Sequence, residues 1–592
     1  MYTRVNNDTR SNKIMDRRSF LRMTTQALTV AICGAHGVAK GATSKPPNII
    51  LIMSDDQGYG DIGAHNNKMI RTPNLDALAR ESLEMTRFYV EPVCSPTRSS
   101  LMTGRYHMRT GVYATSRGGA RIFGDEVTVA DLLARGGYRT GIFGKWHLGD
   151  NYPSRPQDKG FQEILIHLSG AIGGVPDTGR SYFEPTLWHN GRPSPRKGYC
   201  TDLFFDGAID FITTNKNRSF FAYIPTNVPH SPLEVAESFV KPFRNAGLPE
   251  KTAKIYGMIK NLDENVGRLM QVLESQGLSR DTIVIFMTDN GPAGNRFNNG
   301  LRAGKGSVYE GGIRVPFFVR WPRRIRGNTQ IDCISAHIDI MPTLLSVAGL
   351  QIPGNLMIDG VDLTPLWTGQ IAPENWPQRT IFIQLNKRIL QERYQNVAVI
   401  KQDYKLVSYP GSRYDPEFAS KFDKAKVELY DLSLDPGESR NVVQQFPGIR
   451  DRLLAEYEDW FADMKRTRGF QTAPIHLGTP HENPSYLCRY QEGQNLTGTA
   501  SVDGWVVKVT RGGRYELKLQ WPPHNGGVLY VKWLGVESRL TLKPNEFTAQ
   551  LLLQAGTGLL DVGFLDENGR RVVDPWDNKT RGDVIVTRLG DG

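Results

Sequence analysis

Runs of apolar residues recur along the first half of the chain, and polar side chains follow each run directly. The clearest runs lie at 47–53, 140–143, 219–224 and 282–287. Continuous apolar runs of this length predict strands that are buried on both faces of a parallel sheet. Helical patterns separate the strands, including a capped segment at 128–136 and a long amphipathic segment at 251–278. This alternation predicts an α/β fold in which helices sandwich a mostly parallel sheet.

The pattern changes after about residue 380. Short strand-like runs appear at 396–409 and 428–432, a helical pattern follows at 448–464, and five β-prone runs separated by turns lie between 505 and 564. The spacing of these last runs is typical of a β-sandwich. We therefore expect a main α/β domain at 47–375, a smaller antiparallel α+β subdomain at 376–465, a linker rich in Thr, Gly, Pro and His at 466–486, and an appended β-sandwich at 487–592.

Tryptophans in the last region allow two interpretations. Trp505, Trp521, Trp533 and Trp576 lie in or beside the β-prone runs. Large aromatic side chains are usually buried, so these four could form the core of the sandwich. They could instead form an exposed face on which a carbohydrate stacks.

Charge and the N-terminal residues limit the function classes. The formal net charge is +11, of which residues 1–42 carry +5. The remaining surplus of about +6 weakly favours anionic substrates, and no basic tract with interleaved aromatics indicates nucleic acid. Arg17 and Arg18 precede a modestly apolar run at 23–39, which resembles a bacterial twin-arginine export signal. That run is too short and too polar to span a membrane. We expect a signal peptide at 1–42, export by the twin-arginine route, and a periplasmic or secreted protein.

The polar residues that follow the predicted strands carry the candidate chemistry. They are Asp55 and Asp56, Lys145 and His147, His230, and Asp289 and Asn290, with Lys305 in a glycine-rich segment further on. Because open α/β sheets place ligands at the carboxyl ends of their strands, these side chains can converge on one edge. Three aspartates and an asparagine make an all-oxygen site that suits Ca²⁺ or Mg²⁺ rather than zinc. A turn or helix cap is the alternative for the Asp55–Asp56 pair.

Cys94 lies at the start of a predicted helix. Pro96 suits the first turn of that helix, and Arg98 lies one turn further on the same face. A helix start favours an anion or a thiolate, so Cys94, the helix start and Arg98 would together place a nucleophile beside a cation. The alternative is that Cys94 is a small buried apolar residue, as most lone cysteines are.

Two blocks resemble the type I sulfatase family, of the alkaline-phosphatase-like superfamily. The first is Cys94-Ser95-Pro96-Thr97-Arg98 with Leu101-Met102-Thr103-Gly104, and the second surrounds Lys145-Trp146-His147. The resemblance covers about residues 47–465, so 47–375 would be the sulfatase catalytic domain. It implies that a maturation enzyme oxidises Cys94 to formylglycine (3-oxoalanine), an aldehyde whose hydrate is the nucleophile. It also implies one divalent metal, with Ca²⁺ expected and Mg²⁺ as the alternative.

The resemblance implies a role for each site residue. One hydroxyl of the hydrate at position 94 attacks sulfur, and Asp289 is a candidate to accept its proton. His230 or Lys305 protonates the departing alcohol, and His147 helps the second hydroxyl to lose its proton, which expels sulfate and restores the aldehyde. The expected catalytic residues are Cys94, Arg98, Lys145, His147, His230 and Lys305, and the expected metal ligands are Asp55, Asp56, Cys94, Asp289 and Asn290.

The substrate is left open by the sequence. Export, positive charge and the appended β-domain favour a sulfated carbohydrate, with specificity expected in loops at 169–185 and 234–249. One alternative is a phosphoester or phosphonate monoester hydrolase of the same fold, since the cations around Cys94 would hold either tetrahedral oxyanion. Another is a catalytically silent sulfoglycan-binding protein.

Overall fold

The computed structural model describes most of the chain after the predicted signal peptide. The described residues are 45–116, 118–172, 181–386, 391–408, 427–488, 504–520, 526–565, 568–569 and 583–591. The predicted signal peptide at 1–42 lies outside them. Within the described residues, no helix combines the length and the apolar character that a membrane crossing requires.

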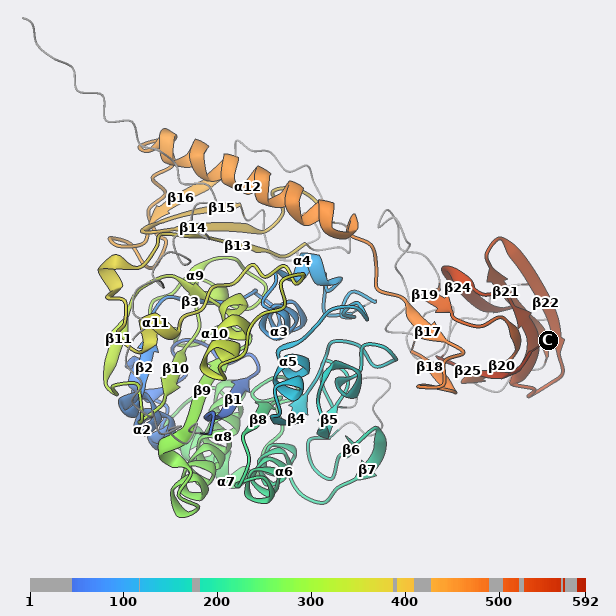
Figure 1. The fold of residues 1–592 in the computed structure, drawn as a ribbon, viewed down its shortest axis with the longest axis horizontal. Helices are drawn as coiled ribbons and strands as arrows, with labels where there is room; N and C mark the ends of the chain where they lie inside the picture. The colour runs from blue at the N-terminus through green and yellow to red at the C-terminus, as the bar shows by residue number, and fades with distance from the viewer. Residues whose placement is uncertain are drawn as a thin grey trace, which may run out of the picture. The chain divides into compact units, whose positions relative to one another are not determined.

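A ten-stranded sheet forms the centre of the α/β domain (Figure 1), with strand order β11-β2-β10-β9-β1-β8-β4-β5-β6-β7. The four predicted apolar runs form its middle strands: β1 Asn48–Ser54, β4 Arg139–Lys145, β8 Phe220–Pro225 and β9 Thr282–Thr288. Strand β1 pairs in parallel with β8 and β9, and β4 pairs in parallel with β8 and with β5 Glu163–His167. The prediction of a mostly parallel sheet is therefore confirmed.

Short strands extend both edges of this sheet, mostly through antiparallel pairing although β11 pairs with β2 in parallel, and the apolar pattern does not predict them. On one side lie β10 Phe317–Arg320, β2 Leu83–Met85 and β11 Thr329–Ile331. On the other side a hairpin of β6 Thr186–His189 and β7 Arg192–Pro195 continues from β5. Strands of three or four residues, several of them partly exposed, carry too few apolar positions to show a period.

Helices cover both faces of the sheet, and strand β1 shows why. Ile49, Leu51 and Met53 point into one apolar core, which the helices α3 Cys94–Thr103, α5 Val129–Arg135 and α10 Ile340–Val347 complete. Ile50 and Ile52 point into the opposite core, under α6 Cys200–Thr214 and α8 Glu250–Ser275. Side chains alternate across a strand, so a run without polar residues needs a cover on each face. Shorter helices are α2 Pro73–Glu81, α4 His107–Thr110, α7 Glu237–Asn245, α9 Glu310–Ile313 and α11 Thr364–Trp367.

The smaller subdomain is a four-stranded antiparallel sheet covered by one long helix. Its strands are β13 Thr380–Gln384, β14 Val397–Lys401, β15 Tyr404–Ser408 and β16 Glu428–Asp431, and the helix is α12 Pro447–Arg468. The Lys405 ammonium is fully buried between Glu310 of α9 and Glu438, at 2.9 Å from each carboxylate. This buried ion pair joins the subdomain to the α/β domain.

Two further sheets pack around one core in the C-terminal part. The first contains β17 Ile475–Leu477, β19 Trp505–Val509, β24 Gly556–Leu565, β21 Gly527–Trp533 and β22 Val536–Leu542. The second contains β18 Ser485–Leu487, β25 Asp583–Gly590, β20 Gly513–Gln520 and β23 Thr548–Leu553. Side chains of both sheets share one apolar cluster, as in a β-sandwich.

Two expectations for this region change. Residues 466–486, predicted as a linker, contain the end of α12 and the strands β17 and most of β18, which pair with the C-terminal sheets. The prediction failed because these two strands have only three residues each and lie in a segment whose composition is otherwise typical of a loop. Trp505 and Trp533 are core residues, exposed by 0% and 5%, so neither forms a stacking face. Trp521 and Trp576 lie outside the described residues.

Candidate active site

The carboxyl ends of the middle strands bring the predicted site residues together. Asp55 and Asp56 follow β1, Lys145 ends β4, His230 follows β8, and Asp289 and Asn290 follow β9. Cys94 is the first residue of α3, and Val93 occupies the N-cap position in extended conformation. Their contacts form three groups: Asp55 with Lys145, Arg98 and Asp289; Asp56 with Asn290, His230 and Lys305; and Cys94 with His147. The Asp56 amide, which donates to Asp289 Oδ1, joins the first two groups, and the charges of Lys145 and Lys305 act on Cys94.

The two adjacent aspartates are each held by a lysine. The Lys145 ammonium lies 2.6 Å from Asp55 Oδ2, and the Lys305 ammonium lies 2.6 Å from Asp56 Oδ1. Asn290 donates from Nδ2 to Asp56 Oδ1 at 2.8 Å. Burial opposes ionisation of both carboxyls, but the nearby lysines and His230 outweigh it and hold the pKa of each below its ordinary value. Both aspartates are therefore carboxylates ready to bind a cation.

Arg98 and Asp289 form a buried pair next to these aspartates. The Arg98 guanidinium is 1% exposed and donates to Asp289 Oδ2 from Nη2 at 2.7 Å and from Nε at 3.2 Å. Its Nη1 donates to the Lys145 carbonyl at 3.0 Å, which fixes the guanidinium against β4. Burial and the charge of Asp55 raise the pKa of Asp289 to about 8, although Arg98 counteracts this shift. Arg98 therefore holds the Asp289 carboxyl in one orientation beside Asp55.

His147 faces residue 94 with one ring nitrogen. The distance from Cys94 Sγ to His147 Nδ1 is 3.4 Å, and His147 Nε2 lies 2.9 Å from the Thr115 carbonyl. A carbonyl only accepts hydrogen bonds, so Nε2 carries the proton and Nδ1 is left as an acceptor toward residue 94. Burial and the neighbouring Lys145 hold the pKa of His147 well below its ordinary value. The imidazole is therefore neutral and oriented as a base.

The backbone conformation of His147 and the glycine at position 170 position the imidazole, and the sequence predicts neither feature. His147 has a left-handed backbone, with φ of 59°. A Cβ at Gly170 would lie 2.9 Å from His147 Cε1, so only glycine leaves room for the ring there. The roles of the Thr115 carbonyl and of Gly170 follow from contacts between segments distant in sequence, which no local pattern reveals.

The donor set fits a hard divalent cation. Asp55, Asp56 and His230 each offer a ligand atom, and these atoms lie within 4.8 Å of one another. Asp55 Oδ1 and Asn290 Oδ1 are buried and have no hydrogen-bond partner among the described residues. Leaving such oxygens unpaired is costly unless they bind something, and a cation satisfies both. His230 Nδ1 lies 2.7 Å from the Ser231 carbonyl and donates to it, which leaves His230 Nε2 facing Asp56 at 3.9 Å.

One carboxylate joins the two loops that we expect to control specificity. Glu234 Oε2 accepts hydrogen bonds from Ser181 Oγ at 2.9 Å and from the Tyr182 amide at 2.8 Å. The Tyr182 hydroxyl in turn donates to the His230 carbonyl at 3.1 Å. The two loops are therefore joined to each other beside His230. Residues 173–180 of the first loop lie outside the described residues.

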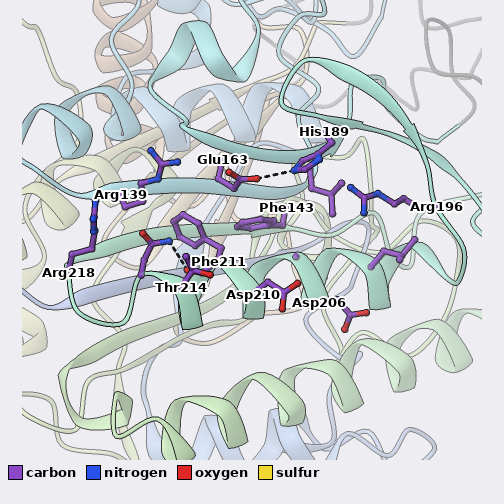
Figure 2. Close-up of a pocket in the computed structure, with 14 residues that line it drawn as sticks. Arg139, Phe143, Glu163, His189, Arg196, Asp206, Asp210, Phe211, Thr214 and Arg218 are labelled. Atoms are coloured by element: carbon purple, nitrogen blue, oxygen red, sulfur yellow. Dashed lines mark hydrogen bonds and ion pairs between the residues drawn. The ribbon is translucent and has the colours of Figure 1, made fainter.

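A separate pocket is lined by β4 residues that precede Lys145, and it does not contain the predicted site residues. Figure 2 shows this pocket, of about 660 Å³, between β4, β5 and α6. Phe143 and Phe211 contribute apolar surface, and His189 Nε2 and Glu163 Oε1 form a hydrogen bond of 3.0 Å at its side. Arg139, the first residue of β4, lines it, whereas the site gathers after Lys145, the last residue of that strand.

Comparison with known proteins identifies the class that this fold and site define. Residues 47–350 match the sulfatase family model, and residues 303–459 match the C-terminal model of N-sulphoglucosamine sulphohydrolase. The chain belongs to the sulfatase family and is a sulfuric ester hydrolase.

Individual relatives place the chain within that family. It is 33% identical to arylsulfatase A of Homo sapiens over 463 residues, which cover 70% of this chain and 86% of the relative. It is 31% identical to N-acetylgalactosamine-6-sulfatase of Rattus norvegicus over 57% of this chain and 69% of the relative. Among solved structures it resembles Ps i-CgsB in complex with k-i-k-neocarrahexaose, with a TM-score of 0.62, 27% identity, and coverage of 70% of this chain and 93% of the other.

Proposed function

We propose that this sulfatase hydrolyses sulfate esters of carbohydrates, with residue 94 matured to formylglycine and one divalent metal, Ca²⁺ or Mg²⁺, bound beside it. The observation that carries the proposal is the cluster of cationic groups around Cys94. Burial opposes ionisation of the Cys94 thiol, but Lys145 and Lys305 outweigh it and lower the pKa of the thiol. A site that stabilises a thiolate also stabilises the tetrahedral oxyanion of a sulfate ester.

The metal would be held by Asp55, Asp56, Asp289 and Asn290 together with the oxygen of the matured residue 94. It would polarise the sulfuryl oxygens and lower the pKa of a hydroxyl at position 94. Asp289 fits this shell through Oδ1, which accepts from the Asp56 amide at 3.2 Å. The chain offers His230 as a further ligand atom in the same cluster.

The chain's own residues would bind the sulfate and move the protons. As formylglycine, residue 94 would supply a hydrated aldehyde whose hydroxyl attacks sulfur. Lys145 and Lys305 would neutralise the sulfate oxygens, and His147 Nδ1, 3.4 Å from Cys94 Sγ, would accept a proton from the second hydroxyl. His230 Nε2 or the Lys305 ammonium would donate a proton to the departing alcohol oxygen.

Several observations support a carbohydrate as the substrate. Relatives are named N-acetylgalactosamine-6-sulfatase, and Ps i-CgsB was crystallised with a neocarrahexaose. The loops joined by Glu234 border the site and could contact a sugar chain. The twin-arginine motif at Arg17 and Arg18 supports a periplasmic or secreted location, where such polymers are met.

The first experiment is the mass of the tryptic peptide 88–98 from protein made in its native host. The thiol-to-aldehyde change makes this peptide lighter than the unmodified one, and that result is expected. Unmodified cysteine in normally exported protein would contradict the proposed nucleophile and would favour a silent sulfoglycan-binding protein. Parallel turnover of aryl sulfate and aryl phosphate, with sulfate preferred, would then exclude a phosphoester or phosphonate hydrolase.

A further inference from the structure

Residues 471–487, here called the C-terminal segment, contact the two loops that flank His147. The first loop comprises residues 113–116 and 118–121, and contains the Thr115 carbonyl that accepts from His147. The second loop, residues 149–155, begins two positions after His147. The Ile122 amide donates to the Leu148 carbonyl at 3.0 Å, so the two loops are also joined to each other.

Two buried donors of the first loop bind backbone oxygens of the C-terminal segment. The Tyr113 hydroxyl donates to the Gln471 carbonyl at 2.9 Å, and Arg121 Nη1 donates to the Ala473 carbonyl at 2.8 Å. Tyr113 is 0% exposed and Arg121 is 2% exposed. Loss of a buried polar partner costs more than the hydrogen bond itself contributes, so these contacts hold the loop in one position. A Cβ at Gly149 would lie 3.0 Å from Arg121 Cγ, which places the arginine directly against the second loop.

The second loop is bound through its backbone. The Tyr152 amide donates to Glu482 Oε2 at 3.1 Å, and the Tyr152 carbonyl accepts from the His476 amide at 3.2 Å. Asn151 Nδ2 donates to the Tyr486 carbonyl at 3.0 Å. The Tyr152 ring stacks on His481, with ring centroids 4.6 Å apart and an interplanar angle of 18°. Amide, carbonyl and ring of one residue are thus held by the same segment.

The C-terminal segment in turn belongs to the β-sandwich. Its strand β17 pairs with β19, and its strand β18 pairs with β25. The β-sandwich therefore holds the C-terminal segment through strand pairing, and the C-terminal segment holds both loops beside His147 through hydrogen bonds. A detachable carbohydrate-binding module would need no such buried contacts with the catalytic domain.

We propose that the C-terminal segment positions the His147 imidazole for proton transfer, so that the β-sandwich is a working part of the active site. This inference rests on the proposed role of His147. Tyr113, Arg121 and Glu482 are the positioning residues. Each acts through the loops, and none of them contacts residue 94 in the described structure.

The test uses full-length, matured protein and three single variants. Tyr113→Phe removes only the hydroxyl that donates to Gln471, and Glu482→Ala removes the acceptor of the Tyr152 amide. Glu482→Gln keeps an acceptor oxygen and should restore the function that Glu482→Ala loses. Glu537→Gln, on the exposed strand β22 of the same sandwich, is the matched control. Turnover of an aryl sulfate and hydrogen–deuterium exchange are measured for each.

We expect kcat to fall by about tenfold to a hundredfold in Tyr113→Phe and Glu482→Ala, with KM within about twofold, because small misplacements of a proton-transfer group have effects of this size. Exchange should rise in peptides covering 147–155 but not in the core strand β9. Wild-type kcat and exchange in both variants would overturn the inference. Absent turnover in matured wild-type protein would contradict the proposed function instead, and the exchange would still decide whether the segment anchors the loops.

Discussion

At the scale of single residues, the site is organised by paired charges. Asp55, Asp56 and Asp289 each contact a cation, namely Lys145, Lys305 or Arg98. Burying a carboxylate costs several kcal/mol unless it is paired, and the pairing here has excellent geometry. Under the proposed function, Lys145 and Lys305 would also neutralise the sulfate oxygens. The proposal therefore gives these two lysines both a structural and a substrate-binding role.

Lys145 provides the sharpest test of this dual role. Its ammonium is 0% exposed and 2.6 Å from Asp55. We expect Lys145→Met to lower kcat/KM for an aryl sulfate by at least about a hundredfold, because removal of one preorganised donor to a developing oxyanion costs this much. Lys145→Arg should not restore activity, since a planar guanidinium does not reproduce the compact ammonium that is buried 2.6 Å from Asp55. Lys260→Met, on the outer face of α8, is the control, and comparable loss there would refute the assignment.

Removal of the metal should lower stability as well as activity. Asp55 Oδ1 and Asn290 Oδ1 lack hydrogen-bond partners among the described residues, so a bound cation should stabilise the folded state. A ligand at a hundred times its Kd contributes about 2.7 kcal/mol. We expect a chelator to lower the thermal unfolding midpoint and added Ca²⁺ to restore it. The midpoint of Asp55→Asn should not respond to either. A chelator-insensitive wild-type midpoint would contradict the metal site.

At the scale of elements, strand ends were predictable and loop contacts were not. An apolar run followed by polar residues identifies a buried strand and its carboxyl end from local sequence alone, as at β1 and β9. The capping box at Thr128 is equally local: its hydroxyl accepts from the Asp131 amide, and the helix α5 begins where the pattern predicts. The contact between Glu234 and Ser181 spans 53 positions and leaves no periodic signal.

That loop contact leads to a prediction about substrate size. Glu234→Ala removes the acceptor of both Ser181 and Tyr182, which should loosen the two loops beside the site. We expect KM for a sulfated oligosaccharide to rise several-fold, while KM for a small aryl sulfate, which does not reach the loops, changes little. Glu237→Ala is the control, because Glu237 forms an exposed ion pair with Arg244 and such pairs contribute little. Equal effects on both substrates would contradict a specificity role for the loops.

At the scale of the whole molecule, the sequence predicts the class of fold and the members of the site, but not how the domains are joined. Family motifs and strand ends supplied the charged and nucleophilic side chains around Cys94, but not the Thr115 carbonyl or Gly170, which hold and accommodate the His147 ring. Strands β17 and β18, each three residues long, were hidden in an apparent linker. Their place follows from pairing with strands that come later in the chain, and such pairing depends on the assembled core rather than on local propensity.

The contact between the C-terminal segment and the catalytic domain should make stability depend on pH. Burial raises the pKa of Glu482 to about 7, and Arg155 only partly offsets it. The folded state therefore holds a proton that the unfolded state releases from about pH 4.5 upward, so this carboxyl lowers stability as pH rises from about 4.5 to about 7, and the effect levels off above pH 7. Glu482→Gln lacks this titration. We expect the variant and the wild type to have similar free energies of unfolding near pH 4.5, and the free energy of unfolding of the variant to be higher at pH 8 by about 3 kcal/mol, with a correspondingly higher unfolding temperature. Thermal unfolding at both pH values measures this difference in stability, and Glu537→Gln should show no such difference from the wild type.

A stability difference between Glu482→Gln and the wild type that is constant with pH would contradict this prediction. It would mean that Glu482 is ionised throughout and that the Arg155 pair, rather than a neutral carboxyl, holds the segment in place.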